Sequence, residues 1–441
     1  MFDNRSAHAT TTARTVALDS LEAGIEAAHP RRVIRDSVSI DGDTLTIAGE
    51  AYDLTDIGKI VVLGGGNAAA HVASVLEPIL DDRLAGGVVV TDDPTETDRV
   101  TVHRGDHPVP SQRGVDGTTV VRNAAANADE STLVLAVITG GASALLPAPA
   151  EGISLEALQA TTNALLESGA TIHEINAVRK HLSALKGGQL ARIAAPATVV
   201  SLIFSDVVGN DLSVIGSGPT VPDDSTYEEA LSVLSEYDVS VPDAVQSHLE
   251  RGANGTLAET PQAGDPIFDR VSNHILADNF TALSAASEVA EARGFTPLIL
   301  SSSIRGEARE AAKSHVAVAE EVLATGNPLS APAVLLAGGE CTVTVHGDGE
   351  GGPSQEFCVS AALELDAERI TVAAVDSDGI DGATDVAGAI VDTDTIADRA
   401  AGANALREND VYPLLAKAGA HLHSGATGTN VNDLRIVVVD A

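Results

Sequence analysis

Short runs rich in valine, isoleucine and leucine alternate along most of the chain with longer amphipathic segments. The short runs are apolar at successive positions, which indicates strands buried on both faces, as in a parallel sheet. The predicted strands are Ile60–Leu63, Gly87–Thr91, Thr132–Ile138, Thr198–Phe204, Val334–Ala337, Ile370–Val375 and Arg435–Val439. The predicted helices are Asn67–Ile79, Leu155–Glu167, Ile172–Leu185, Asn279–Ala292 and Gly306–Ala324. The pattern is typical of an α/β protein.

The domain division is predicted from length and from one polar segment. With 441 residues, 44% of them hydrophobic, the chain is long enough for two α/β cores. The segment Arg251–Pro266 is polar and contains glycine and proline, so it is the best candidate for a linker. We therefore expect an N-terminal domain over residues 1–255 and a C-terminal domain over residues 256–441, although one strand could cross between them.

Acidic residues outnumber basic ones by 63 to 26, which gives a formal net charge of -37. This excess could attract a cationic partner, or it could adapt the protein to high salt, where screening relieves self-repulsion. The acids are scattered along the chain, which favours salt adaptation. Binding to nucleic-acid phosphates needs a basic surface and is therefore not expected.

The sequence contains no pattern typical of a membrane span, a signal peptide, a disulfide framework or a zinc site. There is no apolar run of the length that a membrane span requires, and the N-terminal segment lacks the apolar core of a signal peptide, so we expect a cytoplasmic protein. The two cysteines, Cys341 and Cys358, are too few for a disulfide framework. No pair of histidines has the spacing of a zinc site.

Three glycine- or serine-rich turns follow predicted strands. The first, Gly64–Ala69, fits G-x-G-x-x-A, in which the backbone can approach an anion and the helix start offers N–H groups. It could also be an ordinary turn, or a dinucleotide-binding turn with Asp92 or Asp93 on the ribose. Together the turns predict a phosphate site at one sheet edge. Its candidate residues are Gly64, Gly65, Gly66, Asn67, Gly140, Gly141, Ser143, Ser217 and Gly218.

The first turn holds no lysine, so the charge for a phosphate must come from elsewhere. In the stretch His173–Gly188, a polar stripe at about 100° per residue is formed by Asn176, Arg179, Ser183 and Lys186. The helix is expected to end at a glycine cap next to Lys186. The stripe could be an ordinary solvated helix face. Because the chain has few lysines, we instead expect Lys186 and Arg179 to neutralise a phosphoryl group.

An acidic loop follows a predicted strand of the C-terminal half. It contains Asp376, Asp378, Asp381 and Asp385 and lacks the terminal glutamate of an EF-hand, so a calcium loop is a poor match. The carboxylates could hold Mg²⁺ through water, or the loop could be a plain acidic surface.

Taken together, these segments resemble the glycerate 2-kinase family with its MOFRL-type C-terminal domain. The resemblance runs from about residue 12 to the end. It is carried by HPVP, TGGASALL, ESGATIHEINAVRKHLSALKGGQLA, SDVVGNDLSVIGSGPT, GGECTVTV, DSDGIDGATDVAGAIVD and ATGTNVNDL. This combination of motifs is highly specific.

The resemblance implies a Rossmann-like N-terminal domain, a MOFRL-type α/β domain and an active site in the cleft between them. The implied reaction moves the γ-phosphoryl of ATP to the 2-hydroxyl of D-glycerate, with Mg²⁺ or another divalent cation. Lys186, Arg179 and Asp206 would be catalytic, and Asp206 and Asp376 would hold the metal. The other implied cleft residues are Asn176, Glu340, Gln355, Glu356 and Asn430. We expect a monomer or homodimer with small-molecule partners and no nucleic acid or membrane.

Two departures from the family stand out. The family's first turn usually carries a lysine where this chain has Asn67, and its C-terminal turn usually carries an arginine where this chain has Pro353. Neither replacement is charged, and losing cations at a transferring phosphoryl group costs orders of magnitude in rate. Two alternatives therefore stay open: a kinase of another short hydroxy acid, and a ligand-binding relative that has lost phosphoryl transfer. A nicotinamide-dependent enzyme using Gly64–Ala69 is a more distant third.

Overall fold

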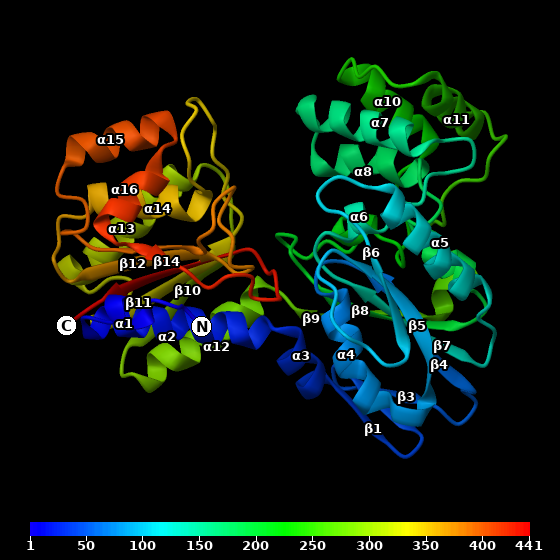
Figure 1. Cartoon of the computed structure of the whole chain (residues 1–441), viewed down its shortest axis with the longest axis horizontal. Helices are drawn as coiled ribbons and strands as arrows, with labels where there is room; N and C mark the ends of the chain where they lie inside the picture. The colour runs from blue at the N-terminus through cyan, green and yellow to red at the C-terminus, as the bar shows by residue number, and fades with distance from the viewer. The chain divides into compact units, whose positions relative to one another are not determined.

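The computed structural model describes all 441 residues, which form two compact units. Unit 1 consists of Met1–Arg32 together with Ala277–Ala441, and unit 2 consists of Val33–Leu276. Each unit contains its own six-stranded sheet (Figure 1). The predicted α/β class is therefore confirmed in both units.

The main sheet of unit 2 has the strand order β6-β5-β4-β7-β8-β9, and the register from β6 to β8 is parallel. Counted along the chain this is the order 3-2-1-4-5-6 of Rossmann folds, which bind ligands where the order reverses, here between β4 and β7. The strands are β4 (Lys59–Gly65), β5 (Leu84–Thr91), β6 (Val100–Arg104), β7 (Thr132–Ile138), β8 (Thr198–Phe204) and β9 (Val271–Ala277). Every residue of β7 is buried, as the unbroken apolar runs predict.

The helices of unit 2 fall into two groups. One group packs along the sheet and includes α4 (Ala69–Leu80) and α5 (Gln112–Ala126). The other surrounds a separate apolar core and consists of α7 (Leu155–Glu167), α8 (Ile172–His181), α10 (Tyr227–Glu236) and α11 (Asp243–Ala253). The remaining elements are α3 (Pro30–Ser37), β1 (Val38–Asp41), β2 (Thr44–Ile47), β3 (Glu50–Asp53), η1 (Asp81–Arg83), α6 (Ala142–Leu145), α9 (Gln189–Ala194), η2 (Ile215–Ser217) and η3 (Pro266–Arg270).

The sheet of unit 1 is mixed, in the order β10-β11-β15-β12-β13-β14. Only β10 and β11 are parallel, because the last long strand inserts antiparallel between β11 and β12. The strands are β10 (Thr296–Ile304), β11 (Ala333–Gly339), β12 (Ile370–Asp376), β13 (Gly388–Val391), β14 (His421–Leu422) and β15 (Asp433–Val439). The helices are α1 (Arg5–His8), α2 (Thr12–Ala28), α12 (Asn279–Ala292), α13 (Ala308–Thr325), α14 (Pro353–Glu364), α15 (Arg399–Glu408) and α16 (Val411–Ala418).

Helices cover both faces of this mixed sheet. Helices α2 and α12 pack against each other beneath it, while α13 to α16 lie above it (Figure 1). The upper layer buries Phe357, Val359 and Ala361 of α14 against the sheet. The N-terminal helices therefore complete one layer of unit 1.

The division of the chain differs from the predicted one at residue 255. The first 32 residues belong with the C-terminal unit, because α2 buries Leu18, Leu21 and Ile25 in that unit. The change from unit 2 back to unit 1 falls after Leu276, at the end of β9.

The predicted linker Arg251–Pro266 lies wholly inside unit 2. It is fixed there by polar contacts: Glu259 accepts hydrogen bonds from the Tyr227 N–H and contacts His181, and Thr260 is buried. A sequence pattern cannot reveal such contacts of Glu259 with distant residues, so the segment has the pattern of a solvated linker. None of the helices is long and apolar enough to span a membrane.

We predict that the close packing of α2 on α12 is needed for the stability of unit 1. A Cβ atom at Gly24 would lie 2.9 Å from the carbonyl oxygen of Ala282. Gly24→Leu should therefore force the helices apart and lower the free energy of unfolding by about 1–3 kcal/mol or more. Urea unfolding followed by circular dichroism measures this. Glu26→Leu, at an exposed position of the same helix, is the control. Equal effects of the two changes would contradict the prediction.

Candidate active site

The three predicted turns lie close together at the point where the strand order of unit 2 reverses. The turn after β4 and the turn after β7 are joined by a hydrogen bond of 2.8 Å from the Asn67 N–H to the carbonyl of Gly140. The turn after β8 reaches the same place, because Gly140 would bring a Cβ atom to 2.6 Å from Asp206 Oδ2. The convergence expected from the sequence is thus present in the geometry.

Glycine is required here because the backbones approach more closely than side chains permit. Gly64 and Gly66 have φ angles of 142° and 133°, where other residues are strained. A Cβ atom on Gly64 would collide with the carbonyl of Val137, and one on Gly66 would collide with Thr139. The motif G-x-G-x-x-A therefore has a structural cause that needs no ligand.

The first turn does not offer the open N–H groups that the sequence motif suggested. The N–H groups of Gly66, Asn67, Ala68 and Ala69 all donate within the protein, to Val90, Gly140, Thr139 and Gly66 respectively. An anion at this edge cannot be held by those amides. This expectation was wrong because tertiary contacts with the turn after β7 satisfy donors that a helix start otherwise leaves free.

Asn67 stands at the centre of a small polar group. Its Nδ2 donates to Asp92 Oδ2 at 3.1 Å, and its Oδ1 lies beside Gly141, which leaves no room for a Cβ atom there. His107 contacts the same glycine, at 3.1 Å from its Cβ position. Asp92 is thus engaged by Asn67, while its Oδ1 has no partner.

Asp206 is the carboxylate at this edge. It follows β8 and is half-buried. Burial raises the pKa of the Asp206 carboxyl, and this is only partly opposed by backbone N–H groups, including that of Gly141, and by the charge of His107. A carboxylate with a raised pKa accepts a proton more readily than an exposed one.

A second set of contacts ties α8 to the turns after β7 and β8. Ser143 and Ser217 hydroxyls lie 2.9 Å apart, and Ser217 Oγ donates to Asn176 Oδ1 at 3.2 Å. The N–H groups of Gly187 and Gly188 donate to the carbonyls of Ser217 and Gly218, at 3.0 and 2.7 Å. Asn176 and the segment after α8 are therefore fixed against these turns.

Helix α8 ends at His181, four residues before its predicted end at Leu185. The backbone of 182–184 turns away to pair with 148–150: Ala150 N donates to Leu182 O, and Ala184 N donates to Ala148 O. Only Asn176 and Arg179 of the predicted stripe lie on the helix. Lys186 lies on the following turn, and Gly188 begins α9 instead of capping α8.

Lys186 and Arg179 are cations without a carboxylate partner. Lys186 is buried, and its Nζ donates only to the carbonyl of Leu146, at 3.2 Å. Burial, aided by the charge of Arg179, lowers the pKa of Lys186 to about 7. Burial also lowers the pKa of Arg179, and no hydrogen bond or ion pair engages its guanidinium. Two desolvated cations side by side are costly unless an anion joins them.

The predicted site residues of unit 1 are of two kinds. Gln355 and Glu356, in the first turn of α14, are buried and bonded internally: Gln355 to Asp381, and Glu356 to Asn409 at 2.8 Å. Pro353 is the first residue of α14, where proline is well tolerated. Glu340 is exposed after β11, and Asn430 accepts from the Asn432 N–H.

Asp376 ends β12 in a cluster of carboxylates. Burial, followed by the charges of Asp378 and Asp433, raises the pKa of Asp376 well above its usual range. Burial likewise raises the pKa of Asp381 to about 7, although Asp381 accepts from the N–H groups of Ser354 and Gln355. No group of three or more His, Cys, Asp or Glu residues is arranged to hold a metal ion.

Two residues that lie beside the carboxylates described above, Arg435 and His107, were not predicted from the sequence to belong to a site. Arg435 is fully buried, pairs with Asp433 and lies 5.4 Å from the ring centre of Phe357. A lone arginine in an otherwise apolar strand was the available signal. His107 belongs to the HPVP motif, which indicated the family but not this position beside Gly141 and Asp206.

We predict that Lys186 lowers the stability of the protein at neutral pH. Its folded pKa of about 7 is below the ordinary 10.5, so the unfolded chain binds more protons between these values and stability rises with pH across that window. Lys186→Met should raise the free energy of unfolding by about 1 kcal/mol or more at pH 7. The gain should shrink as the pH approaches 10.5. Urea midpoints against pH measure this, with exposed Lys417→Met as the control. A pH-independent effect of Lys186→Met would contradict it.

The chain is similar to known proteins along nearly its whole length. Residues 16–250 match a family described as "Domain of unknown function (DUF4147)", and residues 333–433 match the "MOFRL family". A glycerate 2-kinase of Pyrococcus horikoshii is 39% identical over 97% of both chains. A D-glycerate 2-kinase of Thermotoga maritima is 36% identical over 100% of both chains.

Two further comparisons bear on fold and activity. A crystal structure of glycerate kinase from Thermotoga maritima superposes with a TM-score of 0.85 at 36% identity, over 96% of this chain and 99% of that one. A protein of Agrobacterium vitis named "Putative hydroxypyruvate reductase" is 39% identical over 87% of this chain and 100% of its own length. With a Rossmann-order sheet, the convergent turns and full-length similarity to two glycerate 2-kinases, the chain belongs to the glycerate 2-kinase family.

Proposed function

We propose that the protein is a kinase that transfers the γ-phosphoryl of ATP to the 2-hydroxyl of D-glycerate. The observation that carries this proposal is the pair Lys186 and Arg179, two cations without a carboxylate partner beside the turns of a Rossmann-order sheet. Similarity to glycerate 2-kinases over at least 97% of this chain supports the same activity. The net charge of -37 makes high salt the appropriate assay condition.

The two cations meet the main electrostatic requirement of phosphoryl transfer. Charge spreads over the oxygens of the transferring group, and positioned cations stabilise it strongly where water is excluded. Because the amides of the first turn are already bonded, Lys186 and Arg179 supply this charge from side chains. A bound polyanion raises the pKa of Lys186 and keeps the ammonium charged at neutral pH.

Asp206 is the proposed acceptor for the proton of the attacking hydroxyl. Its raised pKa suits a base that works near neutral pH. Gly140 leaves the space into which Oδ2 of Asp206 projects. The carboxylate of glycerate is a second anion for Arg179, since guanidinium binds carboxylates in a bidentate manner.

Magnesium is a proposed companion of ATP. Mg²⁺ bound with nucleotides keeps several waters and needs only one or two protein carboxylates, so the lack of a three-ligand cluster is compatible with it. Asp206 is the proposed carboxylate within unit 2, and the cation would neutralise phosphate charge.

A second candidate function is binding without transfer. It is favoured by Asn67 and Pro353, which are uncharged where the family usually carries a lysine and an arginine. In the structure Asn67 is bonded to Asp92 and Pro353 begins a helix, so neither position supplies a cation. A kinase of another short hydroxy acid is the intermediate possibility.

One assay separates these functions. Purified protein at high salt receives ATP, Mg²⁺ and D-glycerate, or another short hydroxy acid, and ADP and the phosphoglycerate isomer are measured. ADP with 2-phosphoglycerate supports the proposal. Binding of D-glycerate without ADP from any hydroxy acid supports the second candidate. Oxidation of NADH with hydroxypyruvate, in place of ADP formation, would support a reductase.

We predict that Lys186→Ala lowers kcat by about 10²-fold or more, because it removes the cation at the transferring group. Lys417→Ala, an exposed lysine of α16, should keep the wild-type rate. Circular dichroism checks that both variants are folded. A near-normal rate in folded Lys186→Ala would show that the charge comes from another residue.

We also predict that Asn67→Lys raises kcat/KM. It places a cation at the turn after β4, beside Asp92, at the position where the family usually has lysine. Asn67→Met is the matched control, because methionine is similar in length to lysine and carries no charge. Steady-state kinetics with ATP as the varied substrate measures the effect. An equal loss of activity in both variants would indicate that the contact from Asn67 to Asp92 matters more than added charge.

A further inference from the structure

A pocket lies in unit 2 and is lined by other residues than those assigned to the proposed active site. It has a volume of about 280 Å³ and is open to solvent. Its walls come from α5, α8, α9, α10, α11 and the segment after α11. None of the residues assigned above to ATP, glycerate or Mg²⁺ lines it.

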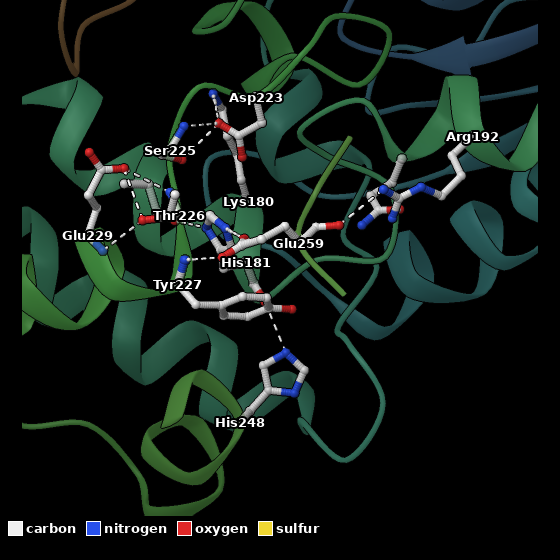
Figure 2. Close-up of polar contacts among 12 residues, drawn as sticks. Lys180, His181, Arg192, Asp223, Ser225, Thr226, Tyr227, Glu229, His248 and Glu259 are labelled. Carbon is white, nitrogen blue, oxygen red and sulfur yellow. Dashed lines mark hydrogen bonds and ion pairs between the residues drawn. The ribbon is translucent and has the colours of Figure 1, made fainter. Parts of the chain in front are cut away.

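Most polar groups in and behind its walls are bonded to one another (Figure 2). Lys180, buried on α8, pairs with buried Asp223 at 3.1 Å. His181 has acceptors at both ring nitrogens: the carbonyl of Ala177 at 2.7 Å and Glu259 at 3.0 Å. The ring of Tyr227 lies between those of His181 and His248. These groups have partners within the protein, so the charges of Lys180 and Asp223 are not available to a ligand.

Three residues of the lining are exceptions, because each carries a buried polar atom that has no hydrogen-bond partner. These atoms are Arg122 Nε, His248 Nδ1 and Thr260 Oγ1. His248 and Thr260 are more than nine-tenths buried, at 7% and 3% exposure. Buried polar atoms are nearly always paired, so three orphans on one pocket indicate a ligand or ordered water.

The chemistry of each orphan atom can be assigned. Arg122 Nε carries a hydrogen and can only donate. His248 Nε2 lies 3.0 Å from the carbonyl of His181, so Nε2 is the protonated nitrogen. Burial lowers the pKa of His248, which leaves Nδ1 as a free acceptor. The Thr260 hydroxyl can donate or accept.

A ligand that satisfies all three atoms must bring both an anionic acceptor and a donor. We propose that this pocket binds a short carboxylate that carries a hydroxyl or ammonium group on the neighbouring carbon. The carboxylate accepts from Arg122, and the hydroxyl or ammonium donates to His248 Nδ1. The volume of about 280 Å³ suits a small metabolite.

Helix α8 gives this pocket a physical connection to the proposed active site. Its residues Lys180 and His181 line the pocket, while Asn176 accepts from Ser217 and the charge of Arg179 acts on Lys186. A ligand that fixes one side of a rigid helix can alter the other side. Binding in the pocket does not itself depend on the kinase activity.

The probes for binding are acetate, glycolate and glycine, which offer a carboxylate alone, with a hydroxyl, and with an ammonium group. Each is titrated calorimetrically into the full chain at constant ionic strength. We expect glycolate or glycine to bind more tightly than acetate. Equal binding of all three, or no binding in the millimolar range, would overturn the proposal and assign the pocket to water.

Variants locate the binding. Arg122→Gln and Thr260→Val should each weaken binding of the preferred probe, the former about tenfold or more because it removes a charge-assisted hydrogen bond. The orphan atoms make no internal bond, so neither change should lower the urea midpoint. Arg31→Gln, at an exposed position in unit 1, is the control. Binding that both variants leave intact would place the probe elsewhere and overturn the proposal.

Discussion

The close approach of the backbones at the ends of β4 and β7 is the constraint on which the candidate site depends. Gly64 and Gly66 occupy positions where any Cβ atom would collide with Val137 or Thr139. This proximity lets the turns bond to each other and consumes the N–H groups of the first turn. The first turn therefore offers no free backbone donor, and we propose that the charge at the site comes from side chains.

Each unit contains charged groups whose pKa is shifted by burial. In unit 2 the cations Lys186 and Arg179 have no carboxylate partner, and burial lowers the pKa of both. In unit 1 burial raises the pKa of Asp376 and Asp381, with Arg435 as the buried cation beside Asp433. Each arrangement costs stability in the unliganded protein. Such costs are typical of residues retained for function, because stability alone would favour replacing them.

The sequence predicted what depends on local pattern. Unbroken apolar runs located buried strands such as Thr132–Ile138 and Thr198–Phe204 with the right bounds. Helix α8 was predicted too long, because the pairing of 182–184 with 148–150 is a tertiary contact that periodicity does not record. The prediction of a linker at 251–266 was wrong for the same reason, since Glu259 makes tertiary contacts with His181 and Tyr227. Lys186 was nevertheless located beside the turns, although from a turn instead of a helix face.

The N-terminal helix α2 belongs to the unit formed by the last third of the chain, so unit 2 is an insertion within unit 1. During synthesis the ribosome releases the whole of unit 2 before it releases β10 to β15. Unit 2 can therefore fold as an uninterrupted piece, while the apolar face of α2 stays unpaired until α12, β12 and β15 are synthesised. The strand β15 pairs with both β11 and β12 and is the last strand of this sheet in chain order, so the sheet of unit 1 closes only after β15 has been synthesised.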